Sequence, residues 1–221
     1  MNVQKNTLVF ASVFMIFSLS VGLPIQATES REQCYNMPKV KIVNKETLLK
    51  EVEMLCTNFE AEVKAASLKI GMPVADKDGL GLAKMFSNLF IPVIDRIAAR
   101  DLDCLTVIEE FRSVVDFEQI TLFKIDDIKK NLSFEKWIRA SLWLQALCFM
   151  LVTDLIFEIT TKVVQNEINA VNFVRDERKI YLEGAAKVIG AFGDADIIEA
   201  AAKKYDEDLM RLIELHFNSK N

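Results

Sequence analysis

Apolar residues recur every three or four positions along most of the chain after residue 44, which is the spacing of one face of an α-helix. A clear stripe begins at Leu48 and continues through Val52, Phe59 and Val63, with lysine and glutamate between its members. Gly71 follows this stripe, as is usual at the end of a helix. The pattern predicts helices over about residues 44–70, 80–100, 101–115, 117–130, 133–175, 177–192 and 196–216.

Three places leave alternatives in these boundaries. Pro92 lies inside the second predicted helix, where it should cause a kink or a break. Residues 119–125 also fit a strand, but we interpret them as helix because no partner strand is obvious. The helix from Ser133 could continue to about Arg175 or bend at residues 159–161.

Asn44 or Thr47 can cap the first predicted helix, and Asp101 or Asp103 the third. Asp196 with Glu199 has the spacing of a capping box at the start of the last one.

Residues 140–153 contain no charged side chain. A helix that is apolar on every side lies in a protein core or in a membrane, and about 14 residues are too few to cross a bilayer. We therefore expect this segment to be the buried central helix of a bundle.

Glycine and proline are scarce, with 7 and 4 residues in the whole chain, which disfavours an all-β fold. The predicted fold is all-α: a single-domain bundle of six to seven helices around the buried apolar central helix. We place the helical domain at residues 45–217, after a polar lead-in (28–44) and before a short tail (218–221).

Residues 1–27 have the layout of a secretory signal peptide, with Lys5 near the start, an uncharged apolar run over 7–23 and small residues behind it. Cleavage after Ala27 fits this layout, and cleavage after Gly22 is the alternative. The run of about 17 residues is also at the lower limit of a membrane span, so an uncleaved anchor competes with this interpretation. We expect a cleaved peptide and a secreted, extracellular protein with no stable membrane span in the mature chain.

The formal net charge is −5 for 27 basic and 32 acidic residues. Loss of the leader removes Lys5 and leaves 26 against 32, or −6. This acidic balance disfavours nucleic acid as a partner, because nucleic-acid surfaces are usually basic.

Four cysteines follow the leader: Cys34, Cys56, Cys104 and Cys148. Their even number in an oxidising compartment predicts two disulfides. We favour pairing Cys56 with Cys148 inside the bundle and Cys34 with Cys104 across its surface. The alternative is that Cys56, Cys148 or both are buried free thiols.

Catalytic chemistry has few candidates. The only histidine, His216, lies six residues from the chain end, and no phosphate-loop, zinc-protease, nucleophile-elbow or dinucleotide-binding motif occurs. Asp154 and Glu158 share one helix face and could act as a carboxylate pair, but a solvated surface is the simpler interpretation. We expect no catalytic site, no metal site and no cofactor.

Two further features concern modification and ligands. Asn131 begins an Asn-Leu-Ser sequon and is a glycosylation candidate.

The middle of the chain is also rich in aromatic residues and methionine, which form either a dense core or the lining of a cavity for an apolar ligand. The apolar-ligand candidates are Phe86, Phe90, Phe111, Trp143, Phe149, Met150 and Phe157.

The sequence thus predicts a secreted, non-enzymatic binding or effector protein that acts through an extracellular protein partner or a small apolar ligand. The alternatives are a membrane-active helical protein that releases residues 140–153 into lipid, a lipid carrier with a Phe/Met-lined cavity, a carboxylate-only enzyme and a helical signalling factor.

Overall fold

The computed structural model describes residues 37–75, 79–115, 122–124, 133–191 and 195–217. These residues form six α-helices, so the predicted all-α multi-helix bundle is confirmed. The helices are α3 (Lys45–Ile70), α4 (Gly81–Ala98), α5 (Cys104–Ser113), α6 (Phe134–Val163), α7 (Ile168–Ala191) and α8 (Ala195–His216).

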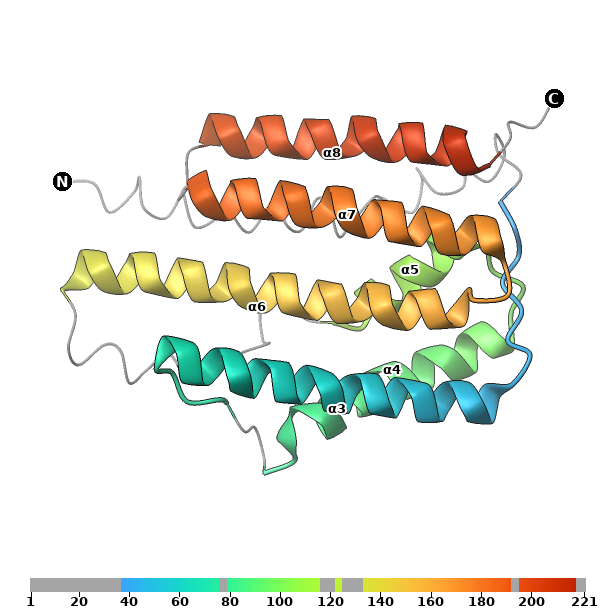
Figure 1. The fold of residues 1–221 in the computed structure, drawn as a ribbon, viewed down its shortest axis with the longest axis horizontal. Helices are drawn as coiled ribbons and strands as arrows, with labels where there is room; N and C mark the ends of the chain where they lie inside the picture. Colours follow the sequence, from blue (N-terminus) through green and yellow to red (C-terminus); the bar gives the residue numbers. More distant parts are fainter. Residues whose placement is uncertain (1–36, 76–78, 116–121, 125–132, 192–194, 218–221) are drawn as a thin grey trace.

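The four long helices lie side by side in the order α3, α6, α7 and α8 (Figure 1). Each packs against its neighbour in that order, while α4 packs against α3 and α5 packs against both α4 and α6. Since α8 occupies one edge of this arrangement, its inward face meets chiefly α7.

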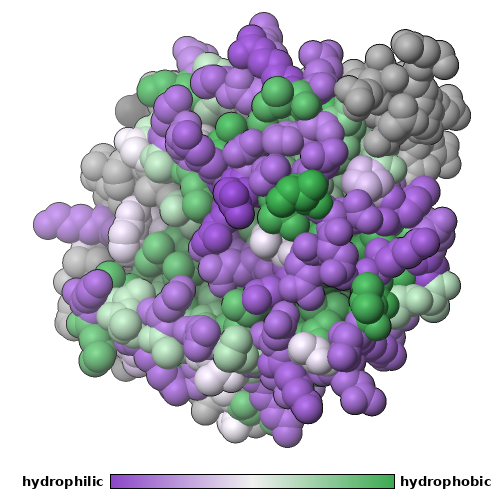
Figure 2. All heavy atoms as spheres, turned by 45° about the vertical axis from the view of Figure 1, so that its right-hand side comes forward, coloured by the Kyte–Doolittle hydropathy of each residue, from purple (hydrophilic) through white to green (hydrophobic). Residues whose placement is uncertain are grey.

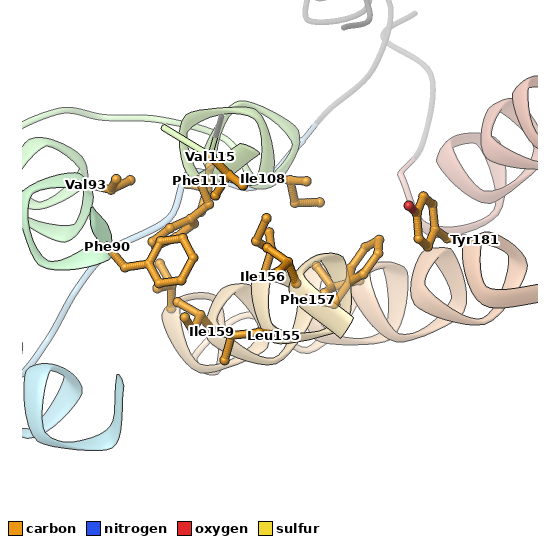
Figure 3. Packing of buried hydrophobic residues seen from close by; sticks show 14 of the residues in the cluster. Phe90, Val93, Ile108, Phe111, Val115, Leu155, Ile156, Phe157, Ile159 and Tyr181 are labelled. Carbon is orange, nitrogen blue, oxygen red and sulfur yellow. The ribbon is translucent and has the colours of Figure 1, made fainter. Parts of the chain in front are cut away.

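The core is continuous through the bundle and is rich in phenylalanine and isoleucine. Figure 3 shows Ile156 and Phe157 of α6 between Phe90 and Phe111 on one side and Tyr181 of α7 on the other. Ile156, Phe157, Phe90 and Phe111 are fully buried. Burying one such side chain contributes about 1.5–3 kcal/mol relative to leaving it in water.

Polar caps determine several helix ends. The side chain of Asn44 accepts a hydrogen bond from the N–H of Thr47 at 3.0 Å, at the start of α3. Gly71 ends the same helix with φ of 67°, a left-handed conformation that glycine adopts without steric cost. Asp103 caps α5 by accepting hydrogen bonds from the N–H groups of Leu105 and Thr106.

A short antiparallel pairing replaces part of one predicted helix. The N–H of Ala75 donates to the carbonyl of Leu122 at 2.9 Å, and the N–H of Lys124 donates to the carbonyl of Pro73 at 2.9 Å. The prediction of a helix over residues 117–130 is therefore wrong at residues 122–124, where the chain is extended. The partner is the segment that follows α3, which carries no strand pattern of its own.

The prediction for the helix after Ser133 is also corrected. Instead of continuing to Arg175 or bending at residues 159–161, α6 ends at Val163, and α7 then runs without interruption from Ile168. No glycine or proline marks this turn. The reversal lets α6 and α7 pack against each other, a tertiary gain that outweighs local helix propensity.

Two other local expectations concern helix ends. Of the kink or break expected at Pro92, the break is absent, because α4 continues through this proline. Asp196 lies inside the first turn of α8 and is therefore not its N-cap.

The uncharged stretch of α6 is not buried on every side. Gln145 is exposed, and Trp143, Leu147 and Met150 are only half-buried. Burial is deeper beyond it, where Leu155 through Val164 include seven residues that are at most 2% exposed: Leu155, Ile156, Phe157, Ile159, Thr160, Val163 and Val164.

The N-terminal end of α6 reaches beyond the near ends of α3 and α7 (Figure 1). Among the helices of the described ranges, none combines the length and the apolar character that crossing a membrane requires.

Candidate functional site

The first candidate site is an apolar edge on the N-terminal half of α6. Trp143, Leu147 and Met150 are spaced by four and three residues, so they lie along one side of the helix. Leu144 and Cys148, one position further on, belong to the adjacent buried stripe. We call Trp143, Leu147 and Met150 the α6 edge.

Apolar residues elsewhere on the surface are isolated from one another. Figure 2, which brings the right-hand end of Figure 1 forward, shows mainly hydrophilic side chains with separate small apolar patches. The strongly exposed apolar residues are spread over several elements, and the two on α3 and the two on α8 are more than ten residues apart. They are Val43, Met54, Leu68, Leu80, Ile168, Ile197 and Leu215. Single residues of this kind are common on soluble proteins.

The other apolar-ligand candidates lie in the interior. Phe86, Phe90 and Phe111 form a chain of ring contacts, with centroids 5.8 Å apart at each step. Phe149 and Phe157 both contact Tyr181, at centroid distances of 6.3 and 5.7 Å. The seven candidates are thus divided among the ring chain, the α6–α7 interface and the α6 edge.

The predicted carboxylate pair lies between α6 and α7. Arg178 donates two hydrogen bonds to Asp154, at 2.6 and 2.8 Å, and a third to Glu158 at 3.3 Å. Partial burial raises the pKa of Glu158 in spite of Arg178, and the charges of Asp154 and Glu62 add to this effect. Both carboxylates therefore share one cation that links the two helices.

The single histidine also takes part in a helix–helix contact. His216 Nε2 lies 2.9 Å from a carboxylate oxygen of Asp176, and the His216 ring packs edge-on against Phe173 at 6.2 Å. This contact joins the end of α8 to α7.

The second candidate site is a buried ionic cluster beneath α8, which sequence reasoning missed. Arg112 of α5 donates to Glu177 Oε1 of α7 at 3.3 Å, and the hydroxyl of Tyr205 on α8 donates to the same oxygen at 2.8 Å. Arg112 and Glu177 are 5% and 1% exposed. The guanidinium carbon of Arg112 also lies 5.2 Å from the ring centroid of Phe157.

A weak signal for this cluster was present in the spacing. Glu177 stands midway between Phe173 and Tyr181, four residues from each, so it belongs to the inward stripe of α7. Because charged residues are usually on the surface, Glu177 and Arg112 were not identified as buried candidates from the sequence.

The electrostatics of the cluster favour a charged pair. Burial opposes the charge of Arg112, but the Glu177 carboxylate outweighs it and raises the pKa of the guanidinium. Burial, together with Glu177, raises the pKa of the Tyr205 hydroxyl well above its usual range. Arg112 Nε and Glu177 Oε2 have no hydrogen-bond partner among the described residues.

The cysteines correct one sequence expectation. Cys56, Cys104 and Cys148 are free, buried thiols, so the favoured Cys56–Cys148 bridge is absent from the structure. Burial raises the pKa of Cys56 and of Cys148 to about 11 and also raises that of Cys104. These thiols pack as small apolar groups, the alternative left open by the sequence.

Cys104 is a free thiol, so the bridge proposed from it to Cys34 is also absent from the structure. Several predicted features lie outside the described residues: the signal peptide at 1–27, Cys34 itself and the glycosylation candidate Asn131. In the ranges that are described, no three histidine, cysteine or acidic side chains gather in a way that could hold a metal ion.

Comparisons with known proteins add no further information on function. No protein-family model, curated protein or solved structure matches this chain.

Proposed function

We propose that this chain is a secreted, non-enzymatic binding protein that acts outside the cell through a protein partner or a small apolar ligand. The observation that carries this proposal is the α6 edge, where Trp143, Leu147 and Met150 pack against the core but stay only partly buried in a helix segment without charge. Aromatic residues and methionine are enriched at protein interfaces, where they bury large areas and adapt to the partner.

The ionisable groups support the same proposal. Asp154 and Glu158 share Arg178, and His216 is held by Asp176. Each contact joins two helices, which gives these residues a structural role. A general acid or base would instead need to reach a substrate.

Membrane activity is the second candidate, because residues 140–153 of α6 carry no charge and leave Trp143, Leu147 and Met150 partly exposed. In this proposal the α6 edge enters the interface of a bilayer, where tryptophan is favoured.

Substitution of Leu147 tests the role of the α6 edge. The chain is expressed through a eukaryotic secretory pathway as wild type, as Leu147→Gln and as Leu68→Gln. Leu68 is a matched control, because it is a leucine on another long helix, α3, and its side chain is 85% exposed. Circular dichroism verifies that all three proteins are folded.

Native mass spectrometry after incubation in the native extracellular fluid then measures the bound mass. We expect wild type and Leu68→Gln to retain an added mass in the range of a lipid or a protein, and Leu147→Gln to lose it. Equal retention by all three proteins would place the contact elsewhere, and retention by none would contradict a binding function.

Neutral and anionic vesicles distinguish the second candidate. A blue shift of tryptophan fluorescence and dye release with wild type, both reduced in Leu147→Gln, would favour membrane activity. No fluorescence change and no dye release at either acid or neutral pH would eliminate it.

A further inference from the structure

The helix α8 is held mainly by one neighbour. It lies at the edge of the bundle and packs chiefly against α7, which runs in the opposite direction (Figure 1). Its buried side chains are spaced by four residues along one face: Tyr205, Leu209, Ile213 and Phe217. Ala201, Met210 and Leu212 also pack, partly buried, against the core. The rest of α8 exposes mainly charged residues, together with Ile197 and Leu215.

The surface covered by α8 contains a charged pair. Tyr205 reaches Glu177, which pairs with Arg112, and one polar atom of each ionic partner lacks a hydrogen bond within the described ranges. Removing two charges from water is costly. The 3.3 Å hydrogen bond between the partners, the 2.8 Å hydrogen bond from Tyr205 and the contact of Arg112 with Phe157 recover only part of that cost. Docking of α8 is therefore weaker than docking on an apolar surface of the same size.

The outward face of α8 carries stabilising contacts of its own. Lys204 pairs with Asp208 at 2.6 Å, and Lys203 pairs with Glu207 at 4.0 Å, both one helical turn apart. Such pairs favour helix without any help from the rest of the bundle.

We propose that α8 is a reversible lid that opens as one unit while the helices from α3 to α7 stay folded. Opening returns Arg112 and Glu177 to water, and their hydration offsets part of the apolar burial that is lost. It also exposes Phe173, Glu177 and Tyr181, which form one stripe on α7 at four-residue spacing. This stripe fits an amphipathic helix with the spacing of α8.

Hydrogen exchange under native conditions tests the lid. If α8 opens alone, the amides of its middle, around residues 203–213, exchange faster than those of α6 around residues 152–160, and they do so as a group. Equal exchange in the two segments would overturn the proposal, because α8 would then be released only by global unfolding.

A triple substitution tests the role of the ionic cluster. Arg112→Met, Glu177→Leu and Tyr205→Phe together replace the cluster by apolar side chains and leave no partner unpaired. We expect exchange in α8 to slow by about tenfold or more, as when buried ion pairs are replaced by packed apolar residues. The matched control, Lys204→Gln with Asp208→Asn, removes an exposed ion pair of α8 and should not slow exchange.

A peptide gives an independent measurement. A labelled peptide of residues 195–217 should bind the full chain by replacing α8. The rate of peptide binding should be lower for the triple variant than for the wild type. No binding at peptide concentrations well above that of the protein, or equal rates in both proteins, would argue against a lid.

Discussion

A carboxylate oxygen of Glu60, on α3, accepts a hydrogen bond from the backbone N–H of Ala83 in the first turn of α4 at 2.8 Å. The side chain of a different helix thus satisfies one of the N–H groups that a helix start leaves free. Gly81 permits this approach, because it has φ of 70° and a Cβ there would lie 3.1 Å from the same oxygen.

Replacement of Glu60 should destabilise the protein in a pH-dependent way. The hydrogen bond from Lys64 and the one from Ala83 lower the pKa of Glu60 in the folded state. Its stabilising contribution is therefore complete above the unfolded pKa, near 4.5, and is lost as the pH falls through the lower folded pKa.

We expect Glu60→Ala to cost about 1 kcal/mol at pH 7, as for loss of a helix cap, and less at pH 3. Urea unfolding at both pH values measures this difference. The exposed Glu53 of the same helix provides the control, Glu53→Ala. A cost for Glu60→Ala that does not depend on pH would show that the carboxylate charge has no part in the cap.

Removal of one partner from the buried ion pair should be far more harmful than removal of the whole cluster. Glu177→Leu leaves Arg112 charged and unpaired in the core, so we expect a loss of about 3–5 kcal/mol in the free energy of unfolding. Addition of Arg112→Met and Tyr205→Phe should recover most of that loss. Denaturant titrations of the two variants measure it, and a triple variant no more stable than Glu177→Leu would contradict this account.

The buried thiols should be inert in the folded protein. Because burial raises the pKa of Cys56 and Cys148 to about 11, few thiolates exist at pH 8, and the side chains are shielded from reagents. We expect negligible alkylation by iodoacetamide before unfolding and rapid alkylation of both residues in guanidinium chloride without reductant.

Peptide mass analysis locates the alkylated residues. If Cys56 and Cys148 do not react after unfolding, the result would support the disulfide between them that the sequence predicted.

The extended pairing beside α6 should be important for stability. Phe123 is fully buried at this pairing, so Phe123→Ala should lower the free energy of unfolding by about 3–5 kcal/mol. The neighbouring exposed residue gives the control, Lys124→Ala, for which we expect a change near zero. Thermal and denaturant unfolding measure both, and similar losses for the two variants would contradict the burial of Phe123.

Local chemistry made much of the fold predictable. The apolar spacing from Leu48 to Val63 predicted α3, while Asn44 and Gly71 marked its ends, because caps and glycine act within one turn of the residues that they stabilise. Asp103 marked the start of α5 for the same reason. Where no such marker exists, as between α6 and α7, the predicted boundary failed.

Contacts between distant segments could not be obtained in this way. The pairing of Ala75 with Leu122 depends on which segments the helices bring together. Residues 119–125 also fitted a strand, but the sequence did not reveal the partner segment after α3. The partial burial of Trp143 depends on which segments pack against α6, which is a property of the assembled bundle.

Helical structure and most helix starts could be predicted from the sequence, because these properties follow from the spacing of apolar residues and from caps within a few residues. The contact of Arg112, Glu177 and Tyr205 beneath α8 and the partial exposure of the α6 edge follow from the packing of the folded chain. A sequence period shows which residues share a face of a helix, but what that face meets depends on the packing of the whole chain.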